Sequence, residues 1–302
     1  MILFALLPIS ALAQPPKNEK RNPNNHAAEL LQRAIRAGMA ARPGAAVVVE
    51  VESGKILAAQ GIETAGRRLA TPGSTVKPFV LMALLNSQKL KPDEAFLCRR
   101  TLRIAGKRMD CTHPQLAAPL NAEEALAYSC NSYFAAMAGR IGAPDLASEF
   151  RRAGFDSLTG LSTYEVAGAV SETQTPDDLK LQALGEKDVK ITPLELVAAY
   201  RALALEHRSG EKSWEVIYRG LADSTAYGMA HAAAPDGYAV AGKTGTANSF
   251  TSALTHGWFA GYAPADKPEI ALVVYLEHGR GSDAARVART IFTAYSKTKG
   301  AR

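Results

Sequence analysis

The sequence of 302 residues predicts an α/β (α+β) fold in which one antiparallel sheet of about five strands is built from both ends of the chain. Short strand-like segments occur within 26–70 and again within 236–302, whereas the spacings within 71–235 are mostly helical. Helical patterns also precede the first strand and follow the last one. We therefore expect N- and C-terminal helices to flank the sheet, with a mostly helical region inserted between its two halves.

The N-terminal half of the predicted sheet is a β-hairpin that follows a helix. A helix is expected over Ala27–Ala41, where apolar residues recur at helical intervals until Arg42-Pro43-Gly44 breaks the pattern. The apolar run 45–51 and the segment 55–59 are then typical of two strands, with Ser53-Gly54 as the turn between them.

Several helix starts are visible in the inserted region. Two of them combine a capping residue with a glutamate three residues later, Asn121 with Glu124 and Thr192 with Glu195. Further helical patterns follow Asn131 and run from Pro144 to Arg152, and a Gly/Ser/Thr-rich loop is expected between them and the Thr192 helix, over 157–178.

The last hundred residues return to strand patterns. A short helix is expected around Ala222–Ala234, before three strand-like segments and a closing helix. The three strands are expected at Tyr238–Ala241, Gly257–Tyr262 and Ile270–Leu276. One face of the closing helix is apolar and comprises Ala284, Val287, Ala288, Ile291, Phe292 and Tyr295.

The N-terminus has the composition of an export signal. Its apolar run ends in Ala11-Leu12-Ala13, which is typical of a secretory signal peptide cleaved before Gln14. The run is too short to span a bilayer, which disfavours an anchoring helix. The expected organisation is a signal peptide, a flexible lead and one folded domain, over 1–13, 14–25 and 26–302. Such a protein would be exported to the periplasm or cell envelope.

Composition and charge are those of an ordinary globular protein. Hydrophobic residues make up 47% and charged residues 21%, and the formal net charge is +6. A positive balance of this size suits an anionic neighbour such as the cell envelope and does not by itself indicate nucleic acid. The six histidines lack metal-binding spacing. We expect no cofactor, no metal and no nucleic-acid partner; an envelope protein partner, if there is one, is not identified by the sequence.

The stretch Thr71–Pro78 places a serine three residues before a lysine. If this stretch is helical, the Ser74 hydroxyl and the Lys77 amine lie on one face, and a desolvated amine can lose its proton and activate the hydroxyl. Thr71 and Pro72 suit an N-cap and a first helical position. Pro78 has no N–H to return to the carbonyl of Ser74, so the turn is expected to be irregular.

The same spacing occurs at Ser209–Lys212 and Ser296–Lys299, so it is not specific alone. Ser74 differs because an apolar helix follows it and because two further triplets occur later, Ser129-Cys130-Asn131 and Lys243-Thr244-Gly245. The first lies between two expected helices, where its polar side chains can face a cleft. On an expected strand, Lys243 and Gly245 share one face, and the glycine would admit a substrate backbone.

Three cysteines are present. Cys98 and Cys111 flank a basic segment in which Gly106 can form the turn of a small hairpin, and a disulfide between them is the first interpretation for an exported protein. A metal site that uses His113 is the second interpretation, since no fourth ligand is apparent. Cys130 is then expected to be a buried free thiol.

The motifs Ser74-x-x-Lys77, Ser129-x-Asn131 and Lys243-Thr244-Gly245 resemble the three motifs of penicillin-binding proteins and serine β-lactamases. The resemblance extends over roughly 40–296. Its further features, which are similar to class B penicillin-binding transpeptidases, are Pro72-Gly73, the Cys98…Cys111 spacing, Thr192-Pro193-Leu194 and Gly242–Ala247. Those enzymes normally carry a membrane anchor and an N-terminal pedestal domain, and only a short segment precedes the first expected strand here.

The resemblance implies a role for each motif residue. Ser74 attacks the peptide carbonyl between two D-alanines of a peptidoglycan stem peptide, or a β-lactam ring, and Lys77 accepts its proton. Ser129 relays the proton to the leaving group, and Asn131 binds a substrate amide. Lys243 keeps Lys77 neutral and helps to bind the substrate carboxylate.

The strand motif is implied to bind substrate with Thr244, Gly245 and Thr246 as well. The backbone N–H groups of Ser74 and Thr246 would form the oxyanion hole. β-Lactams are then expected to act as covalent inhibitors.

The motifs leave open which molecule attacks the acyl-enzyme, so transpeptidase, carboxypeptidase and β-lactamase all remain. The Glu-x-x-Leu-Asn deacylation motif of class A β-lactamases is absent, because Glu123-Glu124-Ala125-Leu126 is followed by Ala127. Glu165 and Glu172 lie in the long loop, where most carboxylates are merely solvated. Slow hydrolysis of penicillin is therefore favoured, and a non-catalytic β-lactam sensor is the binding-module alternative.

A nucleotide-binding protein is a remote alternative, because Gly237–Thr244 matches the P-loop pattern. A P-loop needs a strand before its first glycine and a helix after its threonine. The sequence predicts a helix and Pro235 before the first glycine, and an alternating strand between the glycines.

Overall fold

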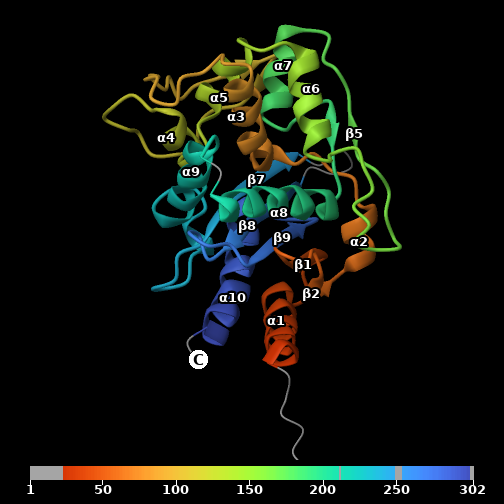
Figure 1. Ribbon diagram of the computed structural model, residues 1–302. Coiled ribbons are helices and arrows are strands. Elements are labelled where there is room, and N and C mark those ends of the chain that lie inside the picture. The colour runs from red at the N-terminus through yellow and green to blue at the C-terminus, as the bar shows by residue number, and fades with distance from the viewer. Residues whose placement is uncertain (1–22, 211, 249–253, 300–302) are drawn as a thin grey trace, which may run out of the picture.

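The computed structural model of the chain describes residues 23–210, 212–248 and 254–299 (Figure 1). The expected signal peptide and most of the expected lead lie outside the described residues. The lead ends earlier than expected, because helix α1 (Pro23–Met39) already begins at Pro23. Among the described residues, no helix is long and apolar enough to cross a bilayer.

The centre of the fold is one five-stranded antiparallel sheet in the order β2-β1-β9-β8-β7. Its strands come from both ends of the chain, which confirms the predicted fold class. They are β1 (Gly44–Glu50), β2 (Ile56–Gln60), β7 (Ala241–Asn248), β8 (Thr255–Ala263) and β9 (Ile270–Leu276). The register places Val47 beside Ala59 on one side and beside Val273 on the other.

The sheet is buried on both faces because successive side chains of a strand point to opposite sides. On one face, Val48 and Leu272 pack against helices α1 and α10 (Gly281–Lys299), which lie side by side in Figure 1. On the other face, Val47 and Val273 join the core of the helical region. All six residues of the predicted apolar face of the closing helix are buried.

The inserted region is mostly helical, as expected. Its elements are α2 (Ile62–Arg67), the 3₁₀ turn η1 (Gly73–Val76), α3 (Lys77–Asn86), α4 (Ala122–Ala127), α5 (Asn131–Ala138), α6 (Ala143–Arg152), α7 (Pro176–Ala183), α8 (Pro193–Ser209) and α9 (Glu215–Ala226). Both predicted capping boxes are confirmed. In α8, the N–H of Glu195 donates to Thr192 Oγ1 (3.2 Å), and the N–H of Thr192 donates to the Glu195 carboxylate (2.7 Å).

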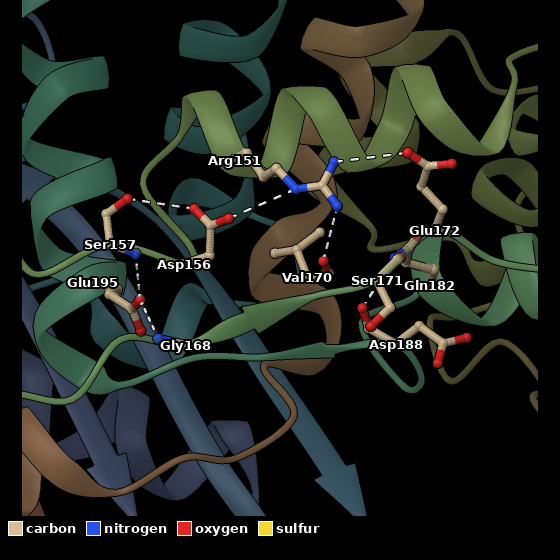
Figure 2. Close-up of polar contacts among 10 residues, drawn as sticks. All are labelled: Arg151, Asp156, Ser157, Gly168, Val170, Ser171, Glu172, Gln182, Asp188 and Glu195. Atoms are coloured by element: carbon tan, nitrogen blue, oxygen red, sulfur yellow. Dashed lines mark hydrogen bonds and ion pairs between the residues drawn. The ribbon is translucent and has the colours of Figure 1, made fainter.

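The loop predicted over 157–178 is only partly irregular. Strand β5 (Ala169–Val170) pairs with β6 (Val189–Lys190), and α7 begins at Pro176 within the predicted loop. Figure 2 shows how polar contacts hold this segment: Glu195 accepts N–H groups of Ser157 (3.2 Å) and Gly168 (2.7 Å), and Arg151 donates to the carbonyl of Val170 (3.0 Å). The loop is therefore fixed to α6 and α8 at its base.

Two further boundaries differ from the prediction. Helix α9 ends at Ala226 and is followed by the 3₁₀ turn η2 (His231–Ala233), where one helix was expected over 222–234. Strand β7 begins at Ala241, where the predicted strand ends. In contrast, the small hairpin around Gly106 is confirmed, with β3 (Arg103–Ile104) paired to β4 (Lys107–Arg108).

Candidate active site

The turn that carries Ser74 is a 3₁₀ turn that runs directly into helix α3. The N–H of Lys77 donates to the carbonyl of Ser74, because Pro78 has no N–H to offer in an α-helical bond. The predicted irregularity is thus present. Thr71 does not cap the helix as expected: the N-cap position is Pro72, and the Thr71 carbonyl accepts the indole N–H of Trp258 (3.0 Å).

The Ser74 turn is packed against strand β7 through two glycines. Gly73 has a φ of 55°, and a Cβ there would lie 2.9 Å from the carbonyl oxygen of Thr246. A Cβ on Gly245 would lie 2.5 Å from the carbonyl oxygen of Pro72. The space beside Gly245 is therefore taken by the turn itself, where the sequence suggested a role in admitting substrate. The half-buried Ser74 lies at this contact.

Lys77 joins the Ser74 turn to the second motif. Its Nζ donates to the Ser129 carbonyl (2.8 Å), to Ser129 Oγ (3.2 Å) and to Asn131 Oδ1 (2.7 Å). These contacts use all three donors of a lysine ammonium. The side chain is fully buried and lies over the ring of Phe134, with 5.1 Å between Nζ and the ring centroid. Three predicted site residues thus meet at one amine.

Burial also makes this amine easy to deprotonate. Desolvation lowers the pKa of Lys77 from 10.5 to about 8. Lys243 is fully buried too, and its pKa is lowered well below 10.5, first by burial and then by repulsion from Lys77. Burial is the leading cause at both lysines, whereas the resemblance assigned the neutral state of Lys77 to Lys243.

The second motif has a constrained backbone. Ser129 lies between α4 and α5 with a φ of 54°, a conformation that costs of order 1–3 kcal/mol for a residue other than glycine. Next to it, Cys130 is the N-cap of α5 and accepts the N–H of Tyr133. The amide of Asn131 is also engaged, because Nδ2 donates to the carbonyl of Met109 (3.1 Å). The Ser129 carbonyl and Asn131 Oδ1, which both accept from Lys77, are therefore held in position by their own surroundings.

On strand β7, the third motif divides between the two faces of the sheet. Lys243 and Gly245 lie on one face, as predicted, and Lys243 Nζ donates to the carbonyl of Thr244 (3.3 Å). The hydroxyls lie on the other face: Thr244 Oγ1 donates to the Met229 carbonyl (3.3 Å), and Thr246 Oγ1 accepts the N–H of Gly281 (2.9 Å). Both threonine hydroxyls thus hold the strand in the fold.

One acidic residue of this region was missed by sequence reasoning. Glu186 follows Gly185, whose carbonyl accepts the N–H of Gly73 (3.0 Å) next to Ser74. Burial raises its pKa to about 7, although the charges of Lys107 and Lys77 lower it. Only the contact with Gly73 reveals this position, because the sequence around Glu186 has no motif.

The two loop carboxylates considered from the sequence are engaged elsewhere. Glu165 accepts the N–H groups of Thr159 and Ser162 and closes its own loop. Figure 2 shows Glu172 beside Arg151, with 4.0 Å between Oε1 and Nη1. Neither contact brings a carboxylate to Ser74.

The expected disulfide is not formed. All three cysteines are free, and Cys98 Sγ lies 3.5 Å from Cys111 Sγ, well beyond a bond length of about 2.05 Å. Cys130 is a buried free thiol, as predicted. It also supplies the fourth donor that the sequence left unidentified, since its sulfur, those of Cys98 and Cys111, and a ring nitrogen of His113 lie within 4.8 Å of one another. These four residues could hold a metal ion.

The structure excludes the nucleotide-binding alternative. Lys243 and Thr244 of the P-loop-like pattern lie within strand β7, which continues to Asn248. No helix begins after Thr244 in the described part of that segment, so no helix N-terminus is available to bind phosphate there.

Known proteins resemble this chain in sequence and in fold. A model of the penicillin binding protein transpeptidase domain matches residues 44–296, which is most of the chain. The chain belongs to this family. Two solved structures share its fold. One is the D,D-transpeptidase domain of a peptidoglycan glycosyltransferase from Eggerthella lenta, with a TM-score of 0.75 and 22% identity over 90% of this chain and 82% of that one.

The other is Pseudomonas aeruginosa PBP2 in complex with WCK 5153, with a TM-score of 0.77 and 22% identity over 88% of this chain and 74% of that one. Among curated relatives, peptidoglycan D,D-transpeptidase MrdA of Acinetobacter baumannii is 25% identical over 60% of this chain and 35% of its own length. Stage V sporulation protein D of Bacillus subtilis is 27% identical over 70% and 38%. This penicillin-binding transpeptidase domain thus spans less than half the length of either curated relative.

Proposed function

We propose that the chain is a peptidoglycan D,D-transpeptidase that works through an acyl-enzyme on Ser74. The proposal rests on one observation above all: the buried Lys77 amine, which directly follows the Ser74 turn, donates hydrogen bonds to Ser129 and Asn131 and has a pKa of about 8. An amine in this state can take the proton of a serine hydroxyl at the pH of a cell envelope. The family and the names of its relatives support the same chemistry.

In the proposed reaction, Ser74 Oγ attacks the carbonyl carbon between two D-alanines while its proton moves to neutral Lys77. The backbone N–H groups of Ser74 and Thr246 stabilise the oxyanion. In support of this pairing, the backbone of Thr246 lies directly against Gly73, the residue before Ser74. Lys243 Nζ binds the substrate carboxylate in this proposal, and the negative charge of that carboxylate would favour the ammonium form that burial disfavours.

Collapse of the tetrahedral intermediate breaks the C–N bond. The proton passes from Lys77 through the Ser129 hydroxyl to the amine of the departing D-alanine, along the contact of 3.2 Å between Nζ and Oγ. An amine of a second stem peptide then attacks the ester on Ser74 and forms the cross-link. A β-lactam would enter the first step and remain bound, because ring opening keeps the leaving amine attached to the ester.

Hydrolysis of the acyl-enzyme is a second candidate, and Glu186 is the observation that favours it. A carboxyl group with a pKa of about 7, on the residue after the Gly185–Gly73 contact, suits a general base for water. The chain would then act as a D,D-carboxypeptidase or a slow β-lactamase.

Labelling of the purified chain with a fluorescent penicillin tests the acyl-enzyme. Wild type should carry a covalent label that denaturation does not remove, and Ser74→Ala should carry none. Ser209→Ala is the matched control, since Ser209 repeats the spacing to a lysine on the exposed end of α8 and should not affect labelling. An unlabelled wild type, or a labelled Ser74→Ala, would refute the proposal.

Product analysis then separates the two candidates. With a pentapeptide donor and an amino-acid acceptor, a transpeptidase releases D-alanine and joins the tetrapeptide to the acceptor through a new amide bond. A carboxypeptidase gives the tetrapeptide alone, and Glu186→Gln should then prolong the lifetime of the penicillin label. An unchanged lifetime in Glu186→Gln removes Glu186 from the reaction.

A further inference from the structure

A short hairpin beside the second motif carries a concentration of positive charge. It spans Arg99–Asp110 and contains strands β3 and β4, and we call it the basic hairpin. Five of its residues are basic and one is acidic, which gives it a net charge of +4, while the whole chain has a net charge of +6. The basic residues are exposed apart from a half-buried Arg100, and they are Arg99, Arg100, Arg103, Lys107 and Arg108.

Most of this charge is not compensated within the described part of the chain. Arg108 pairs with Asp110, but the other four basic side chains make no ion pair with any residue that the structure describes. The register of the hairpin places Arg103 directly opposite Arg108. Like charges in directly opposite positions repel each other and destabilise the pairing of two strands. An anion bound at this face would remove the repulsion.

The basic hairpin is held in place by contacts along its length. Ile104 of β3 is only 1% exposed and belongs to the core of the helical region. The turn has a φ of 47° at Ala105 and of 78° at Gly106, and positive values at both central residues fix the register of a two-residue hairpin. The N–H of Ala105 donates to Asp177 at the start of α7 (3.1 Å). The backbone that carries the basic side chains therefore has a fixed position beside α7.

The hairpin already stabilises one carboxylate at its surface. Asp110 accepts the N–H of Leu102 (2.8 Å) and the Nε–H of Arg108. The N–H of Leu102 and then the contact with Arg108 lower the pKa of Asp110, and the charge of Arg103 adds to the effect. The hairpin thus favours the ionised form of a carboxyl group.

The basic hairpin borders the candidate active site on the side of the second motif. The carbonyl of Met109, near its end, accepts Nδ2 of Asn131 (3.1 Å). On the other side, burial raises the pKa of Glu186 to about 7, and the charges of Lys107 and Lys77 act against burial. One carboxyl group thus interacts with both the hairpin and the active-site amine, so the hairpin lies at the rim of the site.

The proposed reaction brings the attacking amine to this same side. In deacylation, the amine nitrogen of the second stem peptide bonds to the carbonyl carbon, and the ester bond to Ser74 Oγ breaks. The amine proton returns through Ser129 and Lys77 to Ser74. These steps are the reverse of acylation with a new amine, so the attacking nitrogen takes the place of the departed D-alanine, next to the Ser129 hydroxyl. The carboxylate assigned to Lys243 belongs to the first stem peptide, so the hairpin is available for the second.

We propose that the basic hairpin is the acceptor subsite and binds carboxylates of the acidic stem peptide whose amine attacks the acyl-enzyme. This proposal rests on the proposed function. The Arg103 guanidinium can bind a carboxylate through two parallel N–H···O bonds, and Lys107 adds a point charge on the side of Glu186. Unpaired positive charge at the rim also raises the local concentration of an acidic peptide.

Binding of an acidic peptide to the Ser74→Ala chain is the first test, because this variant binds without reacting. The probe is a peptide with two glutamates, a neutral fluorophore and an amidated C-terminus, so that it offers no terminal carboxylate to Lys243. Its match has two glutamines instead. In fluorescence anisotropy the glutamate peptide should bind about fivefold more tightly, and the difference should shrink as salt is raised from about 0.05 to 0.5 M. Equal affinity for the two peptides overturns the proposal.

A double variant of the hairpin locates the binding. In the Ser74→Ala chain, Arg103→Gln combined with Lys107→Gln should weaken binding of the glutamate peptide about fivefold. The variant should fold, since both side chains are exposed and the loss of Arg103 removes the repulsion from Arg108.

The matched control removes the same amount of charge elsewhere. It combines Arg36→Gln with Lys55→Gln, two exposed residues in α1 and in the turn between β1 and β2. Figure 1 shows these elements at the end of the molecule away from α5. The control should bind the glutamate peptide as the Ser74→Ala chain does. Equal weakening in the control and in the hairpin variant would show that only net charge matters and would refute the subsite.

Transpeptidation with the same two peptides as acceptors, each with a free amine, tests the acceptor role. With Ser74 intact, the hairpin variant should raise the KM of the glutamate acceptor about fivefold relative to that of the glutamine acceptor, and the ratio of the two kcat values should stay constant. An unchanged ratio of KM values refutes the acceptor role.

Two further outcomes separate this proposal from its neighbours. A chain that binds the glutamate peptide through the hairpin but is never labelled by penicillin refutes the proposed function, and with it the acceptor role, while the peptide-binding surface stands. Sedimentation with vesicles of anionic phospholipid that depends on Arg103 and Lys107, without binding of the glutamate peptide, overturns the proposal in favour of a membrane contact.

Discussion

The pKa of Lys77 predicts how the acylation rate depends on pH. If neutral Lys77 accepts the proton of Ser74, the rate follows the neutral fraction of this amine. With a pKa of about 8, that fraction is roughly 1% at pH 6 and half at pH 8, so acylation should accelerate roughly fifty-fold between them. It should level off above pH 8. If the amine had the ordinary pKa of 10.5, the acylation rate would still be rising at pH 9.

The sign of the shift follows from the groups around the amine. Burial disfavours the ammonium of Lys77 and is the largest effect. The charge of Lys77 in turn lowers the pKa of Lys243. Cys130, Cys111 and Glu186 favour the ammonium when they are ionised. Because burial dominates, the pKa falls and the neutral form is reached near physiological pH.

The assay is the second-order rate constant for labelling by a fluorescent penicillin between pH 6 and 9. Lys77→Arg is the decisive variant, since a guanidinium keeps the charge and the donors but cannot lose a proton. It should acylate at least about a thousandfold more slowly at every pH. A flat profile for wild type, or substantial labelling of Lys77→Arg, would refute the role of Lys77 as proton acceptor.

Four further variants test the framework of the site and its long loop. Gly73→Ala should lower the free energy of unfolding by about 1–3 kcal/mol in chemical denaturation and slow labelling, because its φ is positive and its Cβ would press on the Thr246 carbonyl. Gly106→Ala, also at positive φ but with open space around it, should keep the labelling rate of wild type. Thr192→Ala removes the cap of α8 and should cost about 1–2 kcal/mol by the same measurement; an unchanged midpoint would contradict this. Glu172→Gln should leave the lifetime of the penicillin label unchanged, and a longer lifetime would implicate the long loop in deacylation.

Features set by neighbouring residues were predictable from the sequence. The caps at Asn121 and Thr192 are local hydrogen-bond patterns, and the structure has both. The 3₁₀ turn at Ser74 follows from the missing N–H of Pro78, which is a covalent property of the chain. The apolar face of the closing helix, with Ile291 and Phe292, is also visible in a single segment.

Features that depend on distant partners were not predictable. The alternation at Tyr238–Ala241 suggested a strand there, but pairing with β8 and packing of the Ser74 turn place β7 over Ala241–Asn248. Helix α7 was missed because its polar start at Pro176 follows a polar loop. The proximity of Cys130 to His113 requires a fold that brings them together, and their spacing in the sequence matches no common motif.

The position of β1 in the sheet has a consequence for folding kinetics. One of its neighbours, β2, is available as soon as the hairpin forms, whereas the other, β9, is encoded about two hundred residues later. Pairing across such a separation carries a large loop-closure entropy, which makes the folding barrier high and the rate slow. A chain released before Ile270 lacks the strand that closes the sheet. The hairpin would then present an unpaired, β-branched edge to other chains, so incomplete products are expected to aggregate.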